Sequence, residues 1–154
     1  MTTSVSKEVE FDAGHRVPNH ASKCRNPHGH RYRVRATATG DLVAEAGASS
    51  EGMVVDFGDL KALLTDLVHD RFDHGFIVHA ADRPMRKALA MLDEPKVIVV
   101  PYIPTAENLA ADIYRTVGPE LADRWGATNV RLTLVEVWET PTSLATYTEV
   151  VGPC

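Results

Sequence analysis

The sequence predicts an α+β fold in which helices lie on one face of an antiparallel sheet. Segments near both ends of the chain alternate apolar and polar residues, as half-buried strands do. Two segments between them repeat apolar residues every three or four positions, as amphipathic helices do. The resulting order is a strand pair, two helices and a second strand pair.

The first strand pair is predicted over residues 5–11 and 30–39, joined by a turn-rich loop at residues 18–23. Apolar and polar side chains alternate in both strands, although Lys7 interrupts the first apolar set. One face of the second strand is apolar. Its other face carries Arg31, Arg33 and Arg35.

The first helix is predicted to follow a loop over residues 40–52 and to end near Arg71, with Asp56 or Asp59 as its N-cap. His69 lies beside the apolar stripe of this helix and is predicted to be a surface residue. The stripe consists of Leu60, Leu63, Leu64, Leu67 and Val68.

The second helix is predicted to begin at Thr105, which suits the N-cap position. Apolar residues recur at helical spacing over residues 109–117. Because proline lacks a backbone N–H and clashes with the preceding turn, Gly118–Pro119 is expected to kink or split the helix before residues 121–125.

The remaining segments complete the predicted sheet. Residues 80–96 are expected to form an exposed excursion with a short helix around residues 85–92. Strands are predicted at residues 96–100, 130–139 and 144–150, and the last two are expected to pair as a hairpin.

Length and composition limit the class of protein. With 154 residues the chain is long enough to bury a core, so one domain over residues 1–154 is expected. The hydrophobic fraction of 44% and charged fraction of 24% are typical of globular proteins. No apolar run approaches the ~20 residues of a membrane span. The net charge of −5 argues against a general nucleic-acid binder.

The N-terminus and the cysteines predict a cytoplasmic protein. No basic region followed by an apolar stretch opens the chain, so no secretory signal is expected. The two cysteines, Cys24 and Cys154, do not form a disulfide framework, and Cys154 is expected to be a free thiol.

A cluster of histidines near the N-terminus is a candidate metal site. His28 and His30 are two residues apart, so an extended backbone directs both imidazoles to one face, and His15 can fold back as a third ligand. Three histidines with an open fourth position are the catalytic form of a zinc site. If Cys24 also binds, the site is closed and structural. Ordinary hydrogen-bonded histidines are the alternative, because proximity in sequence is not geometry.

Two further positions carry weaker signals. Asp73 directly precedes His74, and an aspartate can orient a neighbouring imidazole, although adjacent polar residues are common in loops. Glu107 falls in the first turn of the second helix, where the helix dipole alone favours a carboxylate.

The motifs taken together resemble the 6-pyruvoyl-tetrahydropterin synthase and 6-carboxy-tetrahydropterin synthase family. Each motif is weak alone, but their number and order are specific, and they extend from Phe11 to Thr140. They are F-D-A-G-H, C-x-x-x-H-G-H, V-V-D-F-G-D-L-K, D-H, P-T-A-E-N and V-W-E-T.

The resemblance implies the tunnelling fold. In this fold each subunit supplies a four-stranded antiparallel sheet with two helices on one face, and three subunits close a barrel. Two trimers stack, so a homo-hexamer is expected. Active sites of the family lie between subunits, so a neighbouring chain is expected to complete each site.

The resemblance also implies a zinc centre and a catalytic cysteine. His15, His28 and His30 match the Zn²⁺ ligands, and Cys24 matches the catalytic cysteine, which favours the open form of the site. Asp73 and His74 match the aspartate–histidine pair that works with the cysteine. Glu139 and Glu107 match the glutamates that bind the pterin.

The substrate implied by the resemblance is 7,8-dihydroneopterin triphosphate. The context of Cys24 and the V-W-E-T ending favour the carboxy branch, which releases acetaldehyde and triphosphate and leaves 6-carboxy-5,6,7,8-tetrahydropterin, a precursor of 7-deazapurines such as queuosine. The pyruvoyl branch, a pterin-handling paralogue and a non-catalytic zinc-stabilised binding module are the alternatives. Arg16, Lys23 and Arg31 are candidate triphosphate contacts.

The chain departs from compact members of the family between His74 and Pro104, where it carries a longer segment, and at Gly75. The longer segment is expected to affect the pocket mouth or the subunit contact.

Overall fold

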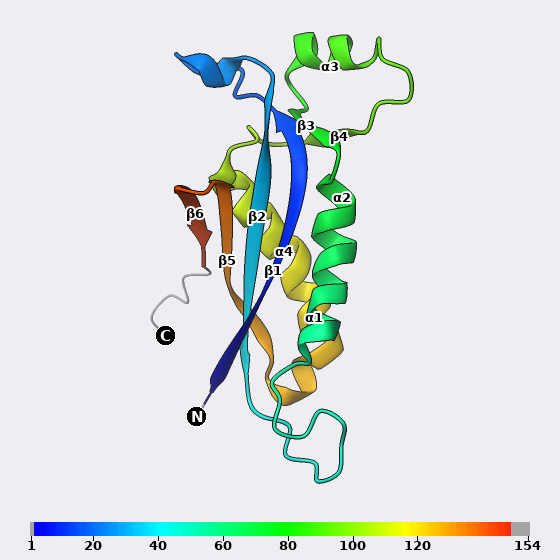
Figure 1. Ribbon diagram of the computed structural model, residues 1–154, viewed down its shortest axis with the longest axis vertical. Coiled ribbons are helices and arrows are strands. Elements are labelled where there is room, and N and C mark those ends of the chain that lie inside the picture. Colours follow the sequence, from blue (N-terminus) through cyan, green and yellow to red (C-terminus); the bar gives the residue numbers. More distant parts are fainter. Residues whose placement is uncertain (1, 149–154) are drawn as a thin grey trace.

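A computed structural model describes residues 2–148 and shows one sheet with helices packed against it (Figure 1). The strands are β1 (Thr3–His15), β2 (His28–Gly40), β3 (Gly75–His79), β4 (Val97–Val100), β5 (Arg131–Thr140) and β6 (Ser143–Tyr147). The helices are η1 (Lys23–Arg25), α1 (Phe57–Leu64), η2 (Thr65–His69), α2 (Asp70–Phe72), α3 (Arg83–Leu89), α4 (Ala106–Trp125) and η3 (Gly126–Thr128). Within residues 2–148, no helix combines the length and apolar character that a membrane span requires.

The α+β class is confirmed, but the expected four-stranded antiparallel sheet is wrong. The sheet has six strands in the order β4-β3-β1-β2-β5-β6. β3 pairs in parallel with β1, and β4 in parallel with β3, whereas the other neighbours are antiparallel. β3 escaped prediction because it is only five residues long and follows the helix closely. The strand predicted at residues 96–100 is confirmed as β4.

β1 and β2 form the long hairpin that dominates the molecule (Figure 1). They pair without interruption from Thr3 opposite Gly40 to His15 opposite His28. β1 is therefore longer than the predicted 5–11. At the other end of the sheet, β6 is described to Tyr147, and residues 149–150 of its predicted range lie outside the described part, as does Cys154.

The first predicted helix is confirmed as a continuous helical run from α1 through the π-helical η2 to α2. Asp56 rather than Asp59 is the N-cap, because its carboxylate accepts a hydrogen bond from the backbone N–H of Gly58 at 2.6 Å. The predicted apolar stripe faces the sheet, where Leu60, Leu63, Leu64 and Val68 are buried.

The expected split in the second helix is wrong, because α4 continues through Pro119 to Trp125. Gly118 precedes the proline, and its missing Cβ removes part of the clash that disfavours helical backbone before proline. Val117 and Leu121 are fully buried on either side of Pro119, so packing continues across it. The Thr105 side chain accepts a hydrogen bond from the Asn108 N–H, as predicted for the cap.

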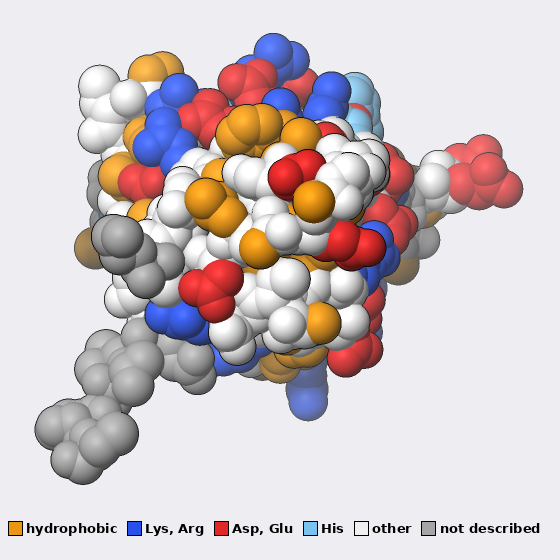
Figure 2. All heavy atoms as spheres, turned by 90° about the horizontal axis from the view of Figure 1, so that it is seen from below, with side chains coloured by type: hydrophobic (Ala, Val, Ile, Leu, Met, Phe, Trp, Pro, Cys, Tyr) orange, Lys and Arg blue, Asp and Glu red, His pale blue; other side chains and the backbone are white. Residues whose placement is uncertain are grey.

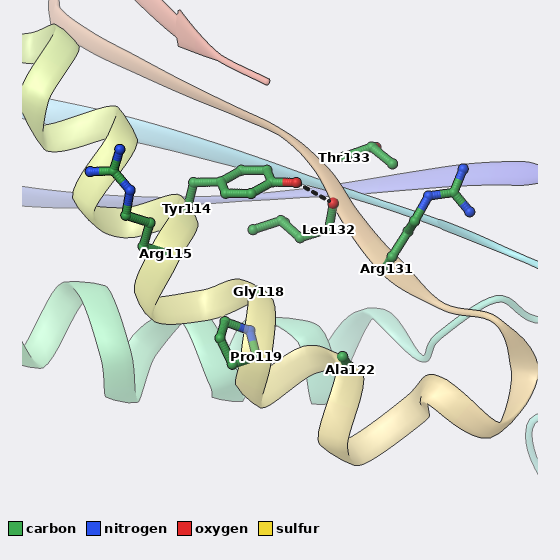
Figure 3. Close-up of a pocket in the computed structure, with 8 residues that line it drawn as sticks. All are labelled: Tyr114, Arg115, Gly118, Pro119, Ala122, Arg131, Leu132 and Thr133. Atoms are coloured by element: carbon green, nitrogen blue, oxygen red, sulfur yellow. Dashed lines mark hydrogen bonds between the residues drawn. The ribbon is translucent and has the colours of Figure 1, made fainter. Parts of the chain in front are cut away.

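A hollow of about 510 Å³ lies between α4 and β5 and is lined by none of the predicted site residues. In this hollow, Tyr114 donates a hydrogen bond to the carbonyl of Leu132 at 2.9 Å (Figure 3). The end of the molecule seen from below shows hydrophobic side chains as separate patches among polar ones (Figure 2). Exposed hydrophobic residues elsewhere include Met91 and Leu92 after α3.

The segment between His74 and Pro104 contains β3, α3 and β4 and is fixed to the rest of the fold by two contacts. Asp82 is only 4% exposed and caps α3 by accepting from the Met85 N–H at 3.2 Å. Its carboxylate also accepts two hydrogen bonds from the Arg16 guanidinium, one of them at 2.6 Å. Gly75 leaves room for Ile98 of β4, since a Cβ there would overlap with that side chain.

We expect Asp82→Asn to lower the free energy of unfolding at pH 7 by about 2 to 4 kcal/mol, because it leaves Arg16 without its partly buried partner. Hydrogen bonds from Arg16 hold the pKa of Asp82 below its usual value of 3.8. The contribution is therefore present above about pH 3.8 and is lost as the pH falls through the lower folded-state pKa. Urea unfolding between pH 7 and pH 2.5 measures it.

The exposed Asp93 supplies the matched control for this experiment. Asp93→Asn should change the free energy of unfolding by less than about 0.5 kcal/mol. Equal stability of Asp82→Asn and the wild type at pH 7 would contradict the role assigned to the ion pair.

Candidate metal centre

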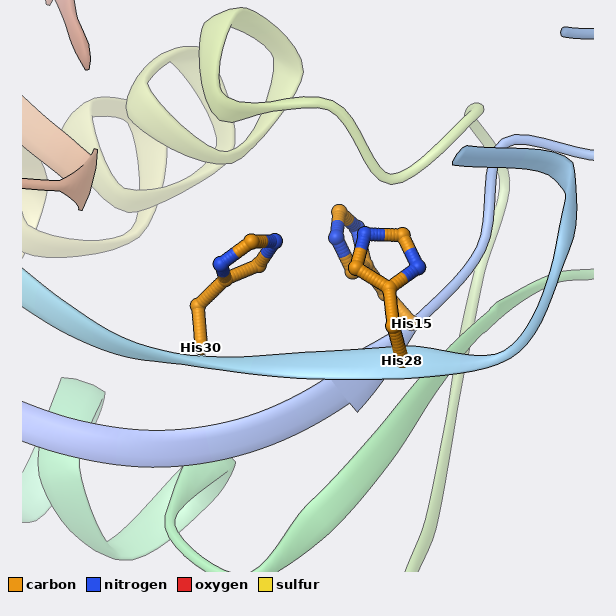
Figure 4. Close-up of side chains that lie close together, drawn as sticks. All are labelled: His15, His28 and His30. Atoms are coloured by element: carbon orange, nitrogen blue, oxygen red, sulfur yellow. The ribbon is translucent and has the colours of Figure 1, made fainter. Parts of the chain in front are cut away.

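The three predicted histidines meet at one end of the β1–β2 hairpin (Figure 4). His15 pairs directly with His28, and His30 is two residues further along β2, so all three side chains share one face of the sheet. One ring nitrogen from each lies within 4.8 Å of those of the other two. Within residues 2–148, this is the group of His, Cys, Asp and Glu side chains arranged to hold a metal ion.

Backbone carbonyls orient two of the imidazoles. Nδ1 of His15 lies 2.6 Å from the carbonyl oxygen of Pro104, and Nδ1 of His28 lies 2.8 Å from that of Asn26. Because a carbonyl can only accept, Nδ1–H donates in both and Nε2 keeps its lone pair. Such carbonyl partners are typical of histidines that bind metals.

The residues present fit a metal ion. Nε2 of His15 and Nε2 of His30 are buried and have no hydrogen-bond partner among the described residues. A buried nitrogen without a partner is costly, and a metal ion would satisfy both atoms at once. The geometric expectation from the sequence is therefore met, although the identity of the metal does not follow from it.

Burial also favours the metal-binding protonation state. It lowers the pKa of His15 and of His30, which keeps both imidazoles neutral near pH 7. The Glu139 carboxylate opposes this effect from close by, with Oε1 at 3.4 Å from Nε2 of His15 and 3.9 Å from Nε2 of His30. Glu139 therefore faces the centre directly.

One pocket of about 260 Å³ joins the centre to three other predicted residues. It is lined by Cys24 from η1, Glu107 from the first turn of α4 and Glu139 from β5, beside His15 and His28. Cys24 is half-buried and does not belong to the three-histidine group. The arrangement thus corresponds to the open form of the site, in which the thiol stands beside the metal position.

Asp73 and His74 lie elsewhere, and His74 lines a pocket of about 520 Å³ together with Asp12 and Arg31. Along β1 and β2, Asp12 and Arg31 alternate with the metal-centre histidines, so this pocket opens on the opposite face of the sheet. His74 has a φ of 57°, and its side chain is 80% exposed. A single chain therefore does not bring His74 to Cys24.

The Asp73–His74 pair itself is well formed. Nδ1 of His74 lies 2.7 Å from Oδ2 of Asp73, and Oδ1 of Asp73 accepts from the Asp12 N–H at 3.0 Å. The Asp12 N–H contributes most to the lowered pKa of Asp73, and the hydrogen bond to His74 adds to it. Asp73 therefore remains a carboxylate that can orient His74.

Sequence reasoning missed the contribution of His69 to this pair. Nε2 of His69 lies 3.8 Å from Oδ2 of Asp73, and Nδ1 donates to the Glu10 carbonyl at 2.7 Å. The predicted surface position is half right, because the side chain is partly exposed but oriented toward Asp73. Its spacing of four residues from Asp73 within the helical run was the available signal.

Two of the three candidate triphosphate contacts are already paired with carboxylates. Arg16 binds Asp82, and Arg31 donates to both carboxylate oxygens of Asp12 at 3.0 and 3.1 Å. Lys23 begins η1, next to Cys24 in sequence. The proposed role of these cations stays a prediction.

Comparison with known proteins identifies the class. The family model described as 6-pyruvoyl tetrahydropterin synthase matches residues 4–150. The chain belongs to this family of enzymes. Solved structures of 6-pyruvoyl tetrahydropterin synthases support the fold. The Plasmodium vivax protein has a TM-score of 0.72 at 18% identity, covering 97% of this chain and 98% of its own, and the Caenorhabditis elegans protein has 0.66 at 21%, covering 97% and 96%.

Curated relatives are more similar in sequence. A Rickettsia bellii protein named 6-carboxy-5,6,7,8-tetrahydropterin synthase is 36% identical, over 88% of this chain and 93% of its own length. A Haemophilus influenzae protein of the same name is 34% identical, over 94% of this chain and 98% of its own.

We expect the purified protein to bind one divalent metal ion per chain, measured by elemental analysis after dialysis. His28→Ala should weaken metal binding by more than about 100-fold, since it removes one of three ligands. His79→Ala, at the end of β3 and outside the group, is the matched control and should keep full occupancy. Full metal content in His28→Ala would contradict the assigned ligand set.

Proposed function

We propose that this protein is a zinc-dependent lyase that converts 7,8-dihydroneopterin triphosphate to 6-carboxy-5,6,7,8-tetrahydropterin, with release of acetaldehyde and triphosphate. The observation that carries the proposal is the three-histidine group, in which two buried nitrogens have no partner, next to a pocket lined by Cys24 and Glu139. The names of the curated relatives support the carboxy product. The ligand set of three imidazoles is one that suits zinc.

His15, His28 and His30 would hold the metal, which supplies Lewis-acid polarisation of substrate oxygens when bound. Cys24 lines the same pocket, which supports the proposal that it accepts a proton from the substrate side chain. Glu139 would accept paired hydrogen bonds from the amino and ring N–H groups of the pterin. Glu107 also lines this pocket and is a second candidate contact with the pterin.

The proposal extends to the assembly. Asp73 and His74 open on the face opposite the metal centre, and they would work on the pocket of a neighbouring chain. β4 and β6 are the two edges of the sheet, and edge strands carry unpaired backbone groups that a neighbour can cover. A homo-hexamer of two stacked trimers is the assembly we propose, with a cytoplasmic role in 7-deazapurine biosynthesis.

The product distinguishes the two branches of the family. Incubating the metal-loaded protein with 7,8-dihydroneopterin triphosphate should yield acetaldehyde, measured by a coupled dehydrogenase assay, together with triphosphate. Release of triphosphate without acetaldehyde would favour 6-pyruvoyl-tetrahydropterin as the product, the activity that gives the family model its name.

Cys24→Ala should abolish turnover while the metal content and the melting temperature stay close to wild type. The physical reason is that Cys24 lies outside the three-histidine group, so its removal takes away a proton acceptor and leaves the ligands intact. Loss of both metal and fold in this variant would instead indicate a closed structural site in a non-catalytic binding module.

Mixed oligomers test whether two chains share a site. Cys24→Ala and His74→Ala chains, each inactive alone, should regain about a quarter of wild-type activity when co-assembled at equal amounts, because random pairing restores that share of sites. The matched control mixes Cys24→Ala with Glu139→Ala. Those residues line one pocket of the same chain, so the mixture should stay inactive. Failure of the first mixture to recover would contradict the shared site.

A further inference from the structure

The hydroxyl of Tyr32 is the third buried polar atom that has no hydrogen-bond partner among the described residues, after the two histidine nitrogens. The Tyr32 side chain is fully buried, at 0% exposure. A buried hydroxyl without a partner destabilises a folded protein, and phenylalanine would fill the same space without that cost. The hydroxyl therefore requires a partner in some state of the protein.

Tyr32 lies directly beneath the metal centre. It is two residues after His30 on β2, so its side chain is on the same face of the sheet. The Tyr32 ring meets the rings of His15 and His30 edge to face, with centroids 5.9 and 5.6 Å apart, and stacks on Phe11 at 5.1 Å. The ring thus separates the centre from the apolar core and is held from both sides.

Glu139 is an acidic group close to Tyr32. Arg33 of β2 pairs with Trp138 of β5, and Tyr32 and Glu139 are the next residues beyond this last pair of the two strands. Both contact the same two imidazoles, those of His15 and His30, Tyr32 through its ring and Glu139 through Oε1. The Glu139 carboxylate is at present directed toward the two histidine nitrogens.

The electrostatics of Tyr32 fit a donor. Burial, with the negative charge of Glu139 adding to it, raises the pKa of Tyr32 far above its usual value. At neutral pH the Tyr32 hydroxyl therefore carries its proton and can donate a hydrogen bond. A carboxylate has about four lone-pair sites, so Glu139 can accept from Tyr32 and from a ligand together.

We propose that Tyr32 is a positioning residue whose hydroxyl donates a hydrogen bond to the Glu139 carboxylate when a pterin occupies the pocket. This bond would fix the plane of the carboxylate for the paired donors of the pterin. The inference rests on the proposed function, because it takes Glu139 as the pterin contact. It adds a residue that acts on the ligand only through Glu139.

Tyr32→Phe tests the proposal, with pterin as the probe and binding to the metal-loaded protein measured by calorimetry. We expect affinity for pterin to fall roughly tenfold, about 1.4 kcal/mol. Metal content should not change, and the melting temperature without pterin should be equal or higher, because the unpaired hydroxyl is gone. In turnover with 7,8-dihydroneopterin triphosphate, KM should rise while kcat stays close to wild type.

Tyr114→Phe is the matched control. The Tyr114 hydroxyl donates to the Leu132 carbonyl at 2.9 Å, in the hollow between α4 and β5 (Figure 3). Its removal should lower the melting temperature and leave affinity for pterin unchanged. The two variants lose the same atom, so opposite patterns of stability and affinity separate positioning from a general effect on the fold.

A double variant tests the route through Glu139. In a Glu139→Ala background, Tyr32→Phe should cause no further loss of affinity. A second tenfold loss there would overturn the proposal, because the hydroxyl would then act on something other than Glu139. Equal affinity of Tyr32→Phe and the wild type would also overturn it and leave the proposed function intact. Failure of the wild type to bind pterin would overturn both.

Discussion

The register of β1 against β2 is the constraint on which the rest of the site depends. His15 lies opposite His28 in this register, and a slip of one residue would move one set of imidazoles to the other face of the sheet. Both faces of the hairpin favour the same register. Phe11 stacks on Tyr32 on the buried face, and on the polar face Arg31 pairs with Asp12 and Arg35 with Glu8. The metal centre follows from packing and ion pairing along the whole hairpin.

The centre also couples the hairpin to α4. Pro104, whose carbonyl holds the His15 ring, stands just before the N-cap of α4. The same helix start brings Glu107 to the pocket wall. His15 is 1% exposed, so this hydrogen bond is shielded from water. Water molecules would otherwise compete for the carbonyl and weaken the bond. One contact therefore sets both the position of Glu107 on the pocket wall and the orientation of the His15 imidazole.

Alternating and helical residue patterns predicted the features of the fold that depend on neighbouring residues. The spacing of His28 and His30 was sufficient to place two imidazoles on one face, whereas His15, beyond the predicted strand over residues 5–11, was assigned to the site by the family resemblance. β3 could not be predicted, because a five-residue parallel strand next to β1 depends on a contact between distant segments. For the same reason, the adjacency of Asp73 and His74 was visible in the sequence, whereas the face on which they lie was not. The course of α4 through Pro119 depended on packing with the sheet, which overrides helix propensity.

The parallel strands β3 and β4 explain why the candidate site residues fall into two pockets. β3 begins directly after His74 and pairs with the end of β1, which fixes the Asp73–His74 pair beside Asp12 and away from Cys24. The segment with α3 and β4 adds two contacts to this part of the fold. Asp82 accepts hydrogen bonds from Arg16, and Ile98 packs against Gly75. Because carboxylates of the same chain already neutralise Arg16 and Arg31, binding a triphosphate at either one would require its carboxylate to be displaced. A cation supplied by a neighbouring chain would avoid that cost, which is a second physical reason for a site shared between subunits.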